Sequence, residues 1–101
     1  MLRSGAVMDT AEQTKFYPMS YYVYILRSQK DKTKLYIGST HDLEFRIKEH
    51  NQGKSQYSKI YTPWELEVFI SFKTRDLAQS FERYLKSGSG HAFLKKRFLP
   101  K

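Results

Sequence analysis

Apolar residues follow regular patterns from residue 21 onward. The run Tyr21-Tyr22-Val23-Tyr24-Ile25-Leu26 is almost continuously aromatic or β-branched, which is typical of a strand that packs on both faces. A polar, basic stretch over residues 27–34 separates it from a second apolar segment, Leu35-Tyr36-Ile37-Gly38. This pattern predicts a β-hairpin with a long basic turn. Gly38 would end the second strand and supply a backbone conformation or a close approach that a side chain prevents.

The next segment has the period of a helix. Side-chain oxygens in residues 39–42 can cap its first turn, and Asn51-Gln52-Gly53 supplies a stop. Between these signals, apolar residues recur at i and i+4. Arg46 and His50 lie one turn apart beside this apolar stripe, so the helix would place both at the edge of its buried face.

A third strand is predicted after a polar loop through Lys59 and a turn at Thr62-Pro63. Polar and apolar residues alternate from Trp64 to Phe72, which is the period of a half-buried strand. The residues expected on one face are Leu66, Val68, Ile70 and Phe72.

A second helix is predicted after Thr74, which can cap it, and the segment Ser87-Gly88-Ser89-Gly90 would end it. Glu82 falls on the buried flank of this helix. An unpaired carboxylate there is unfavourable, and it normally binds a cation or hydrogen-bond donors. Residues 91–98 would form a short basic closing helix.

The elements occur in the order β-β-α-β-α-α without an internal repeat. This order predicts a mixed α/β protein of the α+β type, with a small three-stranded, mainly antiparallel sheet flanked by helices. Residues 1–20 lack regular apolar spacing and are expected to form a flexible N-terminal tail, whereas residues 21–101 form one domain. The chain has no cysteine, which excludes disulfides and thiolate zinc sites. This fits a reducing compartment and equally an extracellular protein built without disulfides, and we expect the cytoplasm. No segment is apolar enough to span a membrane.

The net charge of +8 suits a polyanionic partner. Basic residues gather in the hairpin turn, in the loop after the first helix and near the C-terminal end. We expect these clusters to contact nucleic-acid phosphates, with a loop tyrosine stacking on unpaired bases. The residues concerned are Lys30, Lys32, Lys34, Lys54, Tyr57, Lys59, Lys95, Lys96 and Arg97. Solubility alone is the alternative interpretation of any one cluster.

Two phenols, a guanidinium, an imidazole and a carboxylate form a second set of candidate residues. They belong to Tyr24, Tyr36, Arg46, His50 and Glu82. Cutting a phosphodiester with a single divalent metal needs a base, a cation against the phosphate and a metal ligand, and this set contains each of them. Taken singly, each residue has an ordinary role in packing or on the surface, so the interpretation depends on the whole set.

The spacing of these residues resembles that of the GIY-YIG nuclease domain family over residues 21–98. Tyr22-Val23-Tyr24 is similar to the first triplet of the family, and Tyr36-Ile37-Gly38 matches the second. Arg46, His50 and Glu82 fall at the positions of the family's arginine, histidine or tyrosine, and metal-binding glutamate. The chain most resembles the small stand-alone bacterial members related to the nuclease module of the excinuclease C subunit.

The resemblance implies a role for each residue. Glu82 would bind one divalent ion, Mg²⁺ or Mn²⁺, because a hard carboxylate suits these ions and the chain lacks soft thiolate ligands. Arg46 would bind the non-bridging phosphate oxygens. Tyr36 or His50 would be the general base, and Tyr24 would position the water or orient the phosphate.

The implied function is a divalent-metal-dependent endonuclease that hydrolyses DNA phosphodiester bonds in repair or recombination. Its selection of substrate would depend on structure or be weakly specific, and it would act as a monomer or weak dimer, with a repair protein as a possible partner. Three positions, Tyr22, Ser39 and Leu94, depart from the family's pattern. They leave open a catalytically weak nucleic-acid-binding module, and an adaptor for a repair protein is the third alternative.

Overall fold

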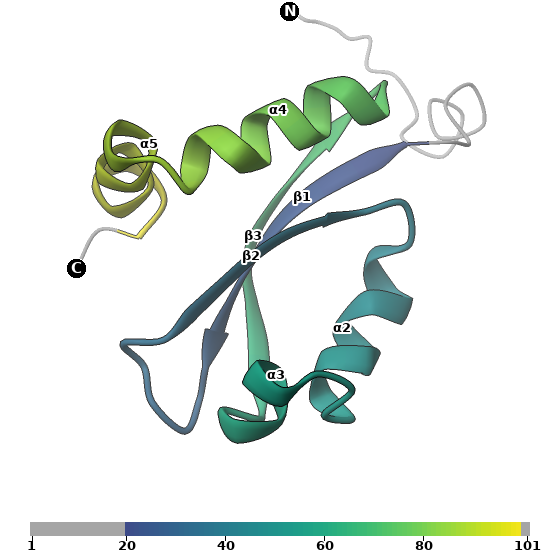
Figure 1. The fold of residues 1–101 in the computed structure, drawn as a ribbon, viewed down its shortest axis with the longest axis vertical. Helices are drawn as coiled ribbons and strands as arrows, with labels where there is room; N and C mark the ends of the chain where they lie inside the picture. Colours follow the sequence, from purple (N-terminus) through teal and green to yellow (C-terminus); the bar gives the residue numbers. More distant parts are fainter. Residues whose placement is uncertain (1–19, 100–101) are drawn as a thin grey trace, which may run out of the picture.

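A three-stranded antiparallel sheet lies at the centre of the computed structural model, which describes residues 20–99 (Figure 1). Its strands are β1 (Tyr21–Ser28), β2 (Leu35–Thr40) and β3 (Trp64–Phe72), in the order β2-β1-β3. Strand β1 pairs antiparallel with both neighbours, so β2 and β3 are edge strands. The predicted α+β fold and hairpin are confirmed. Apart from Ser20, the predicted tail lies outside the described residues.

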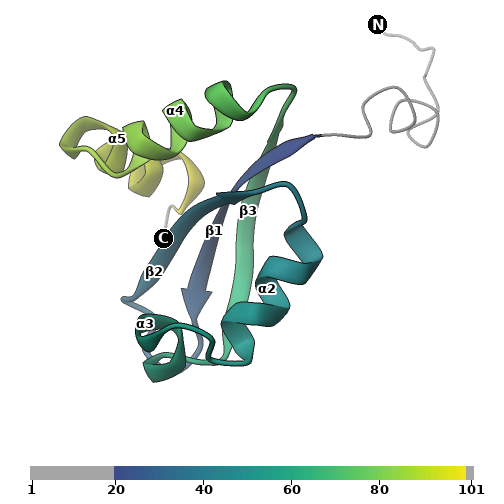
Figure 2. The same cartoon turned by 45° about the vertical axis from the view of Figure 1, so that its right-hand side comes forward.

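Helices cover both faces of this sheet (Figures 1 and 2). On one face lie α2 (Leu43–Asn51) and the short α3 (Gln56–Ile60). On the other lie α4 (Arg75–Leu85), α5 (Gly88–Phe93) and the π-helical turn η1 (Leu94–Phe98). No helix among residues 20–99 has the length and apolar character needed to cross a membrane.

The alternation of β1 divides the interior into two clusters, one on each face of the sheet. Facing α4 and α5, the buried residues are Val23, Ile25, Ala78, Leu85 and Leu94. Facing α2 and α3, they are Tyr24, Leu26 and Trp64. The central strand is therefore covered on both faces, as its unbroken aromatic and β-branched run predicts.

One strand and two helices differ from the sequence-based expectation. A register shift between Ile25 and Leu26 pairs them with Val68 and Leu66, leaving Glu67 as a bulge. Leu66 therefore packs with Tyr24 and Leu26, whereas Val68 packs with Val23 and Ile25 on the opposite face. The expectation that Leu66 and Val68 share one face is wrong, because a bulge inserts one residue and reverses the side-chain phase beyond it.

The two helix differences come from serine caps. Helix α3 lies in the segment expected to be a polar loop, and the Ser55 hydroxyl accepts a hydrogen bond from the Ser58 N–H at 3.2 Å. Helix α5 begins at Gly88, inside the segment expected to end a helix, and Ser87 caps it through the Gly90 N–H. A Cβ at Gly90 would overlap the carbonyl oxygen of Tyr84, so α5 needs glycine to pack against the end of α4.

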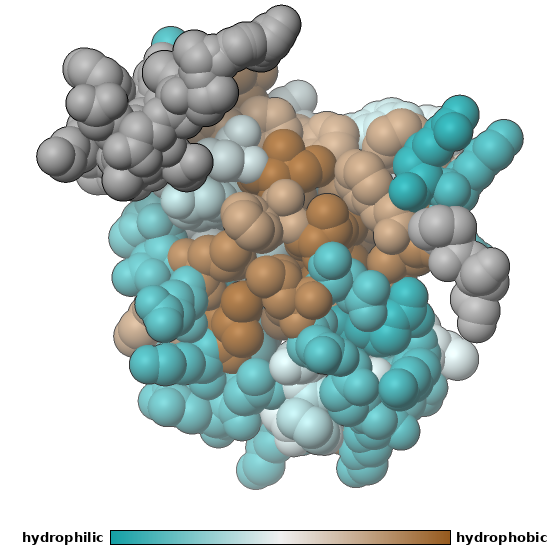
Figure 3. Space-filling model, turned by 180° about the vertical axis from the view of Figure 1, so that it is seen from behind, coloured by the Kyte–Doolittle hydropathy of each residue, from teal (hydrophilic) through white to brown (hydrophobic). Residues whose placement is uncertain are grey.

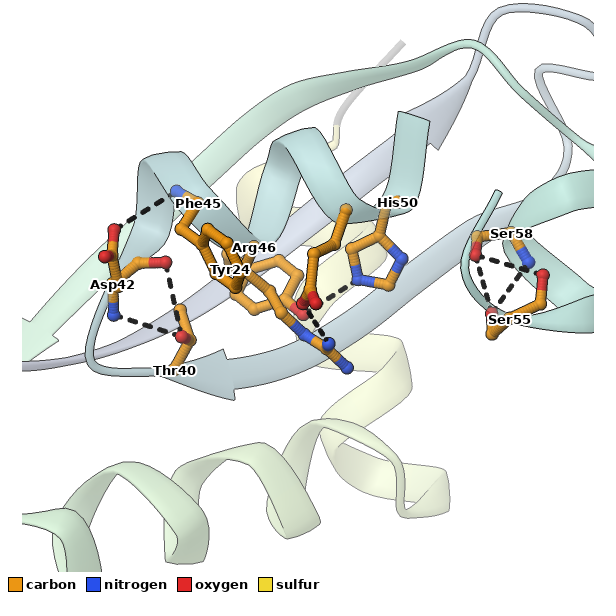
Figure 4. Close-up of polar contacts among 9 residues, drawn as sticks. Tyr24, Thr40, Asp42, Phe45, Arg46, His50, Ser55 and Ser58 are labelled. Carbon is orange, nitrogen blue, oxygen red and sulfur yellow. Dashed lines mark hydrogen bonds and ion pairs between the residues drawn. The ribbon is translucent and has the colours of Figure 1, made fainter. Parts of the chain in front are cut away.

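The two ends of α2 follow the sequence signals. Asp42 is the N-cap, and its carboxylate accepts a hydrogen bond from the Phe45 N–H at 3.1 Å (Figure 4). Gly53 has a φ of 71°, in the left-handed region that favours glycine after a helix. These caps set where α2 begins and ends, and therefore where Arg46 and His50 lie.

The side of the molecule that faces away from the viewer in Figure 1 has an uneven surface character. Seen from behind, apolar side chains gather in the upper half of the molecule and hydrophilic ones cover the lower half (Figure 3). Two large apolar side chains, Phe69 of β3 and Leu77 of α4, are 46% and 55% exposed. The candidate catalytic residues lie instead around β2.

Candidate active site

The edge strand β2 separates the two groups of candidate catalytic residues. Tyr24, Tyr36, Arg46 and His50 lie on the face that α2 covers, whereas Glu82 belongs to α4 on the other face. They are not isolated from each other, because Ser39 of the edge strand β2 bonds to Glu82 and, like Arg46, lines a surface groove. A groove of about 590 Å³ crosses this edge, lined by Ser39 of β2, Arg46 of α2 and Ala78 of α4.

A buried hydrogen bond joins the first tyrosine triplet to α2. The Tyr24 hydroxyl lies 3.0 Å from Nε2 of His50 (Figure 4), and these side chains are 1% and 3% exposed. Burial raises the pKa of Tyr24 to about 12, although the nearby Arg46 guanidinium opposes the shift. Tyr24 therefore keeps its proton at neutral pH and can donate it to the imidazole.

The imidazole of His50 is held neutral. Burial, together with the positive charge of Arg46, lowers the pKa of His50 below its usual 6.5. At neutral pH, a neutral imidazole has one donating and one accepting ring nitrogen, so the tautomer of His50 sets which of the two groups donates in this bond.

Tyr36 completes the aromatic wall of the site. Its ring centroid lies 4.2 Å from that of His50, and it stacks on Tyr24 at 6.2 Å with 12° between the planes. Unlike Tyr24 and His50, Tyr36 is only partly buried and lines a surface groove. Tyr36 is therefore the phenol of this pair that a substrate can reach.

The close packing of the tyrosines depends on Gly38. A Cβ at this position would lie 2.6 Å from the Tyr24 hydroxyl oxygen and 3.1 Å from a ring carbon of Tyr36. The backbone of Gly38 is not in the left-handed region. Of the two reasons for a glycine that the sequence suggests, the geometry fits close approach.

Arg46 presents its charge at the border between the buried network and the groove. Its guanidinium donates to Glu49 at 2.8 Å, and its side chain is 39% exposed. The Glu49 carboxylate, and next the Tyr24 phenol, raise the pKa of Arg46 further, so the cation is permanent. Glu49 is not among the predicted site residues, although its i, i+3 spacing from Arg46 is a signal for such a pair.

Glu82 is held by two donors on the far side of β2. The Ser39 hydroxyl donates to Oε1 at 2.7 Å and Lys86 donates to Oε2 at 2.8 Å. The Glu82 side chain is 20% exposed. In the sequence, Ser39 is only a departure from the family pattern, and Lys86 is not among the predicted site residues. The i, i+4 spacing from Glu82 was the available signal for Lys86.

The expected divalent ion has one candidate ligand. Among residues 20–99, no group of three or more His, Cys, Asp or Glu side chains could together hold a metal. Mg²⁺ commonly keeps several waters and binds through one or two carboxylates plus substrate phosphates. A single, partly exposed carboxylate, bonded to Ser39 of the groove lining, therefore fits a hydrated ion that would share its coordination with the substrate.

A second, basic groove extends along the hairpin side of β2, with a volume of about 800 Å³. Of the residues predicted to bind nucleic acid, Lys32, Lys34, Tyr57 and Lys95 line it. The basic residues that the sequence analysis missed there are Arg27, Lys86 and His91. The predicted residues outside its lining are Lys30, Lys54, Lys59, Lys96 and Arg97. Lys30 instead donates to the Ile60 carbonyl at 3.2 Å.

The sheet, its helical layers and this set of phenols, imidazole, guanidinium and carboxylate agree with a known class of catalytic domain. A family model described as the GIY-YIG catalytic domain matches residues 20–96. The chain therefore belongs to the GIY-YIG family, as the sequence predicts, and its catalytic domain is of the nuclease type.

Individual relatives fall into two groups. The chain is 41% identical over 68 residues to a UPF0213 protein of Haloquadratum walsbyi, covering 66% of this chain and 74% of the relative. It is 40% identical over 84 residues to the structure-specific endonuclease subunit slx1 of Aspergillus niger, covering 74% of this chain but only 20% of the relative. A solution structure of a UPF0213 protein from Bacillus halodurans is similar, with 30% identity and a TM-score of 0.50. The match covers 81% of this chain and 89% of that one.

Proposed function

We propose that the protein is a divalent-metal-dependent endonuclease that hydrolyses DNA phosphodiester bonds and selects its substrate by structure rather than by sequence. The observation that carries this proposal is the buried Tyr24–His50 hydrogen bond, which adjoins Arg46 and Tyr36 where they border the grooves around β2. Buried polar groups are retained where they are hydrogen-bonded to each other, and such networks hold neighbouring groups in fixed positions.

Within this proposal, the arginine binds the phosphate. Glu49 holds one edge of the Arg46 guanidinium and the Tyr24 hydroxyl also interacts with it, which leaves further N–H donors for the non-bridging oxygens. The guanidinium stabilises the charge that develops on these oxygens in the transition state. Donors of this kind typically contribute on the order of 10²–10³ in rate.

Tyr36 is the proposed residue that meets the attacking water. It is partly exposed and lines a groove, whereas His50 is buried and its Nε2 is occupied by Tyr24. His50 then acts as a positioning residue that holds both phenols. A divalent ion bound at Glu82 would supply positive charge against the phosphate and the leaving oxygen.

Recognition of DNA structure is the proposed basis of substrate choice. The slx1 relatives are named structure-specific endonuclease subunits, which favours a substrate chosen by its structure and a protein partner for this chain too. The net charge of +8 favours contacts to the phosphate backbone, which carry little sequence information.

One observation favours a second candidate, a nucleic-acid-binding module without cleavage. Both carboxylate oxygens of Glu82 are engaged, one by Ser39 and the other by Lys86. Surface ion pairs such as Glu82–Lys86 contribute only about 0.3–0.5 kcal/mol, so a divalent ion can displace the lysine at little cost. We therefore favour the enzyme.

Nicking of a supercoiled plasmid with added Mg²⁺ or Mn²⁺ tests the proposal. We expect cleavage by the wild type, loss of cleavage in Glu82→Gln and Tyr36→Phe, and retained DNA binding in both variants. Asp76→Asn, at an exposed position in the first turn of the same helix as Glu82, is the matched control and should cleave normally. Binding without cleavage by the wild type would favour the second candidate.

A further inference from the structure

The charge of the basic groove differs from that of the groove beside Arg46. Five of its lining residues are lysine or arginine, namely Arg27, Lys32, Lys34, Lys86 and Lys95, and none is aspartate or glutamate. The groove beside Arg46, in contrast, includes Asp42 and Glu49. Within residues 20–99, no salt bridge neutralises Lys32, Lys34 or Lys95. The basic groove therefore suits a polyanion with several negative charges.

Two residues connect the basic groove to the candidate active site. Tyr36 lines the groove and contacts His50 through its ring. Lys86 also lines the groove, and its ammonium group bonds to Glu82. A polyanion in the groove would therefore continue directly into the position where a phosphate meets Tyr36 and Glu82.

Tyr57 gives the groove an aromatic surface. Its ring is 39% exposed, and its hydroxyl donates to the Leu35 carbonyl at 3.0 Å. The rings of Tyr61 and Trp64 support it, with centroids 5.1 and 5.8 Å away. A ring that is already fixed loses little conformational entropy on binding, and base stacking on such a ring contributes about 1–3 kcal/mol per base.

We propose that the basic groove holds an unpaired DNA strand that continues from the scissile phosphate, with a base stacked on Tyr57 and phosphates on Lys34 and Lys95. This inference rests on the proposed function and specifies its substrate as DNA with a junction between paired and unpaired strands. Bases in a duplex are already stacked on each other, so a duplex offers Tyr57 nothing to bind. The volume of the basic groove, about 800 Å³, is also within the range of pockets that bind small ligands.

Binding of a labelled oligothymidylate of about ten nucleotides to the full chain in EDTA tests the site without cleavage. We expect tighter binding of this strand than of a duplex of equal length. Tyr57→Leu should weaken single-strand binding about tenfold, within the range that stacking provides, and leave duplex binding unchanged. Tyr57→Phe keeps the ring and should bind as the wild type does.

The lysines provide a matched pair that does not depend on the aromatic packing. Lys95 lines the groove and its neighbour Lys96 does not, although both are exposed. Lys95→Ala should reduce the slope of log affinity against log salt by about 0.7, the value for one phosphate contact on a single strand, and Lys96→Ala should not. This comparison holds even if Tyr57→Leu lowers the folding stability.

Equal affinity for single strand and duplex, together with no effect of Tyr57→Leu or Lys95→Ala, would overturn the inference. Amide shifts on titrating the oligothymidylate give an independent location. We expect them around Leu35, Tyr57 and Lys95, and shifts confined to Thr40 and Gln79 would contradict it. Because these measurements exclude metal, a failure to nick plasmid would reject the proposed function without altering their outcome.

Discussion

Successive side chains of β1 point to opposite faces of the sheet, and the two sets differ in chemistry. Towards α4 and α5, its side chains Val23 and Ile25 belong to an apolar cluster with Ala78, Leu85 and Leu94. Towards α2, its next side chain, Tyr24, is just as buried but brings a hydroxyl that bonds to His50. The face covered by α4 and α5 can therefore contribute only to folding stability. The other face can accept polar groups in its core because they satisfy each other.

The largest effect that separates the faces is expected from Leu85→Ala. Leu85 of α4 is fully buried in the cluster between this helix and the sheet. The cavity left by the substitution should lower the free energy of unfolding by about 2–5 kcal/mol. The folded fraction should still cleave normally. Denaturant unfolding measures this, with Leu77→Ala as the control because Leu77 is 55% exposed on the same helix. Equal losses in the two variants would contradict the assigned burial.

The reverse pattern is expected from Arg46→Ala on the other face. Its side chain is partly exposed, so folding stability should change little. Nicking should fall on the order of 10²–10³-fold, because a donor to the transition-state charge is lost. Lys48→Ala, at an exposed position on the same helix, controls for loss of positive charge and should retain activity. A similar loss in both variants would show a general electrostatic effect instead.

A smaller effect, on folding stability, is expected from Gly38→Ala. The new Cβ would collide with the Tyr24 hydroxyl, and overpacking of this kind typically costs about 1–3 kcal/mol. The Tyr24→Phe/Gly38→Ala double variant removes the colliding oxygen and should regain part of the lost stability, measured by thermal unfolding. No recovery would mean that the strain lies elsewhere in β2.

The smallest effect is a pH dependence of stability that belongs to the α2 face alone. Burial lowers the pKa of His50 in the folded state, so the unfolded chain binds the proton more readily. Stability due to neutral His50 is present above pH 6.5 and is lost as the pH falls below it. His50→Gln should flatten the decline of the melting temperature below that pH, and the exposed His41→Gln should not. An unchanged decline in His50→Gln would contradict this assignment.

Local signals predicted the elements that build the site. The caps at Asp42, Gly53 and Thr74 and the alternation in β3 are all visible in short windows of sequence. These windows placed Arg46 and His50 on one helix and Glu82 on another. They could not place the helices on opposite sides of an edge strand, because that depends on the order of strands in the sheet.

Side-chain partners from distant segments were less predictable. The Ser39–Glu82 bond joins residues 43 positions apart, and its formation depends on how α4 crosses β2. The bulge at Glu67 also has no strong local signal, since the polar and apolar alternation continues through it. The basic groove is similar, because its lysines come from the hairpin, from α4 and from η1 and adjoin only after folding.

Gly90 ties the basic end of the chain to the groove from a position that contacts no candidate substrate group. Its missing side chain lets α5 abut Tyr84 at the end of α4, and the η1 turn with Lys95 follows directly. A larger residue there would displace α5 from the end of α4, and η1 with Lys95 would move with it. The position of Lys95 in the basic groove therefore depends on a glycine that lies outside the groove lining.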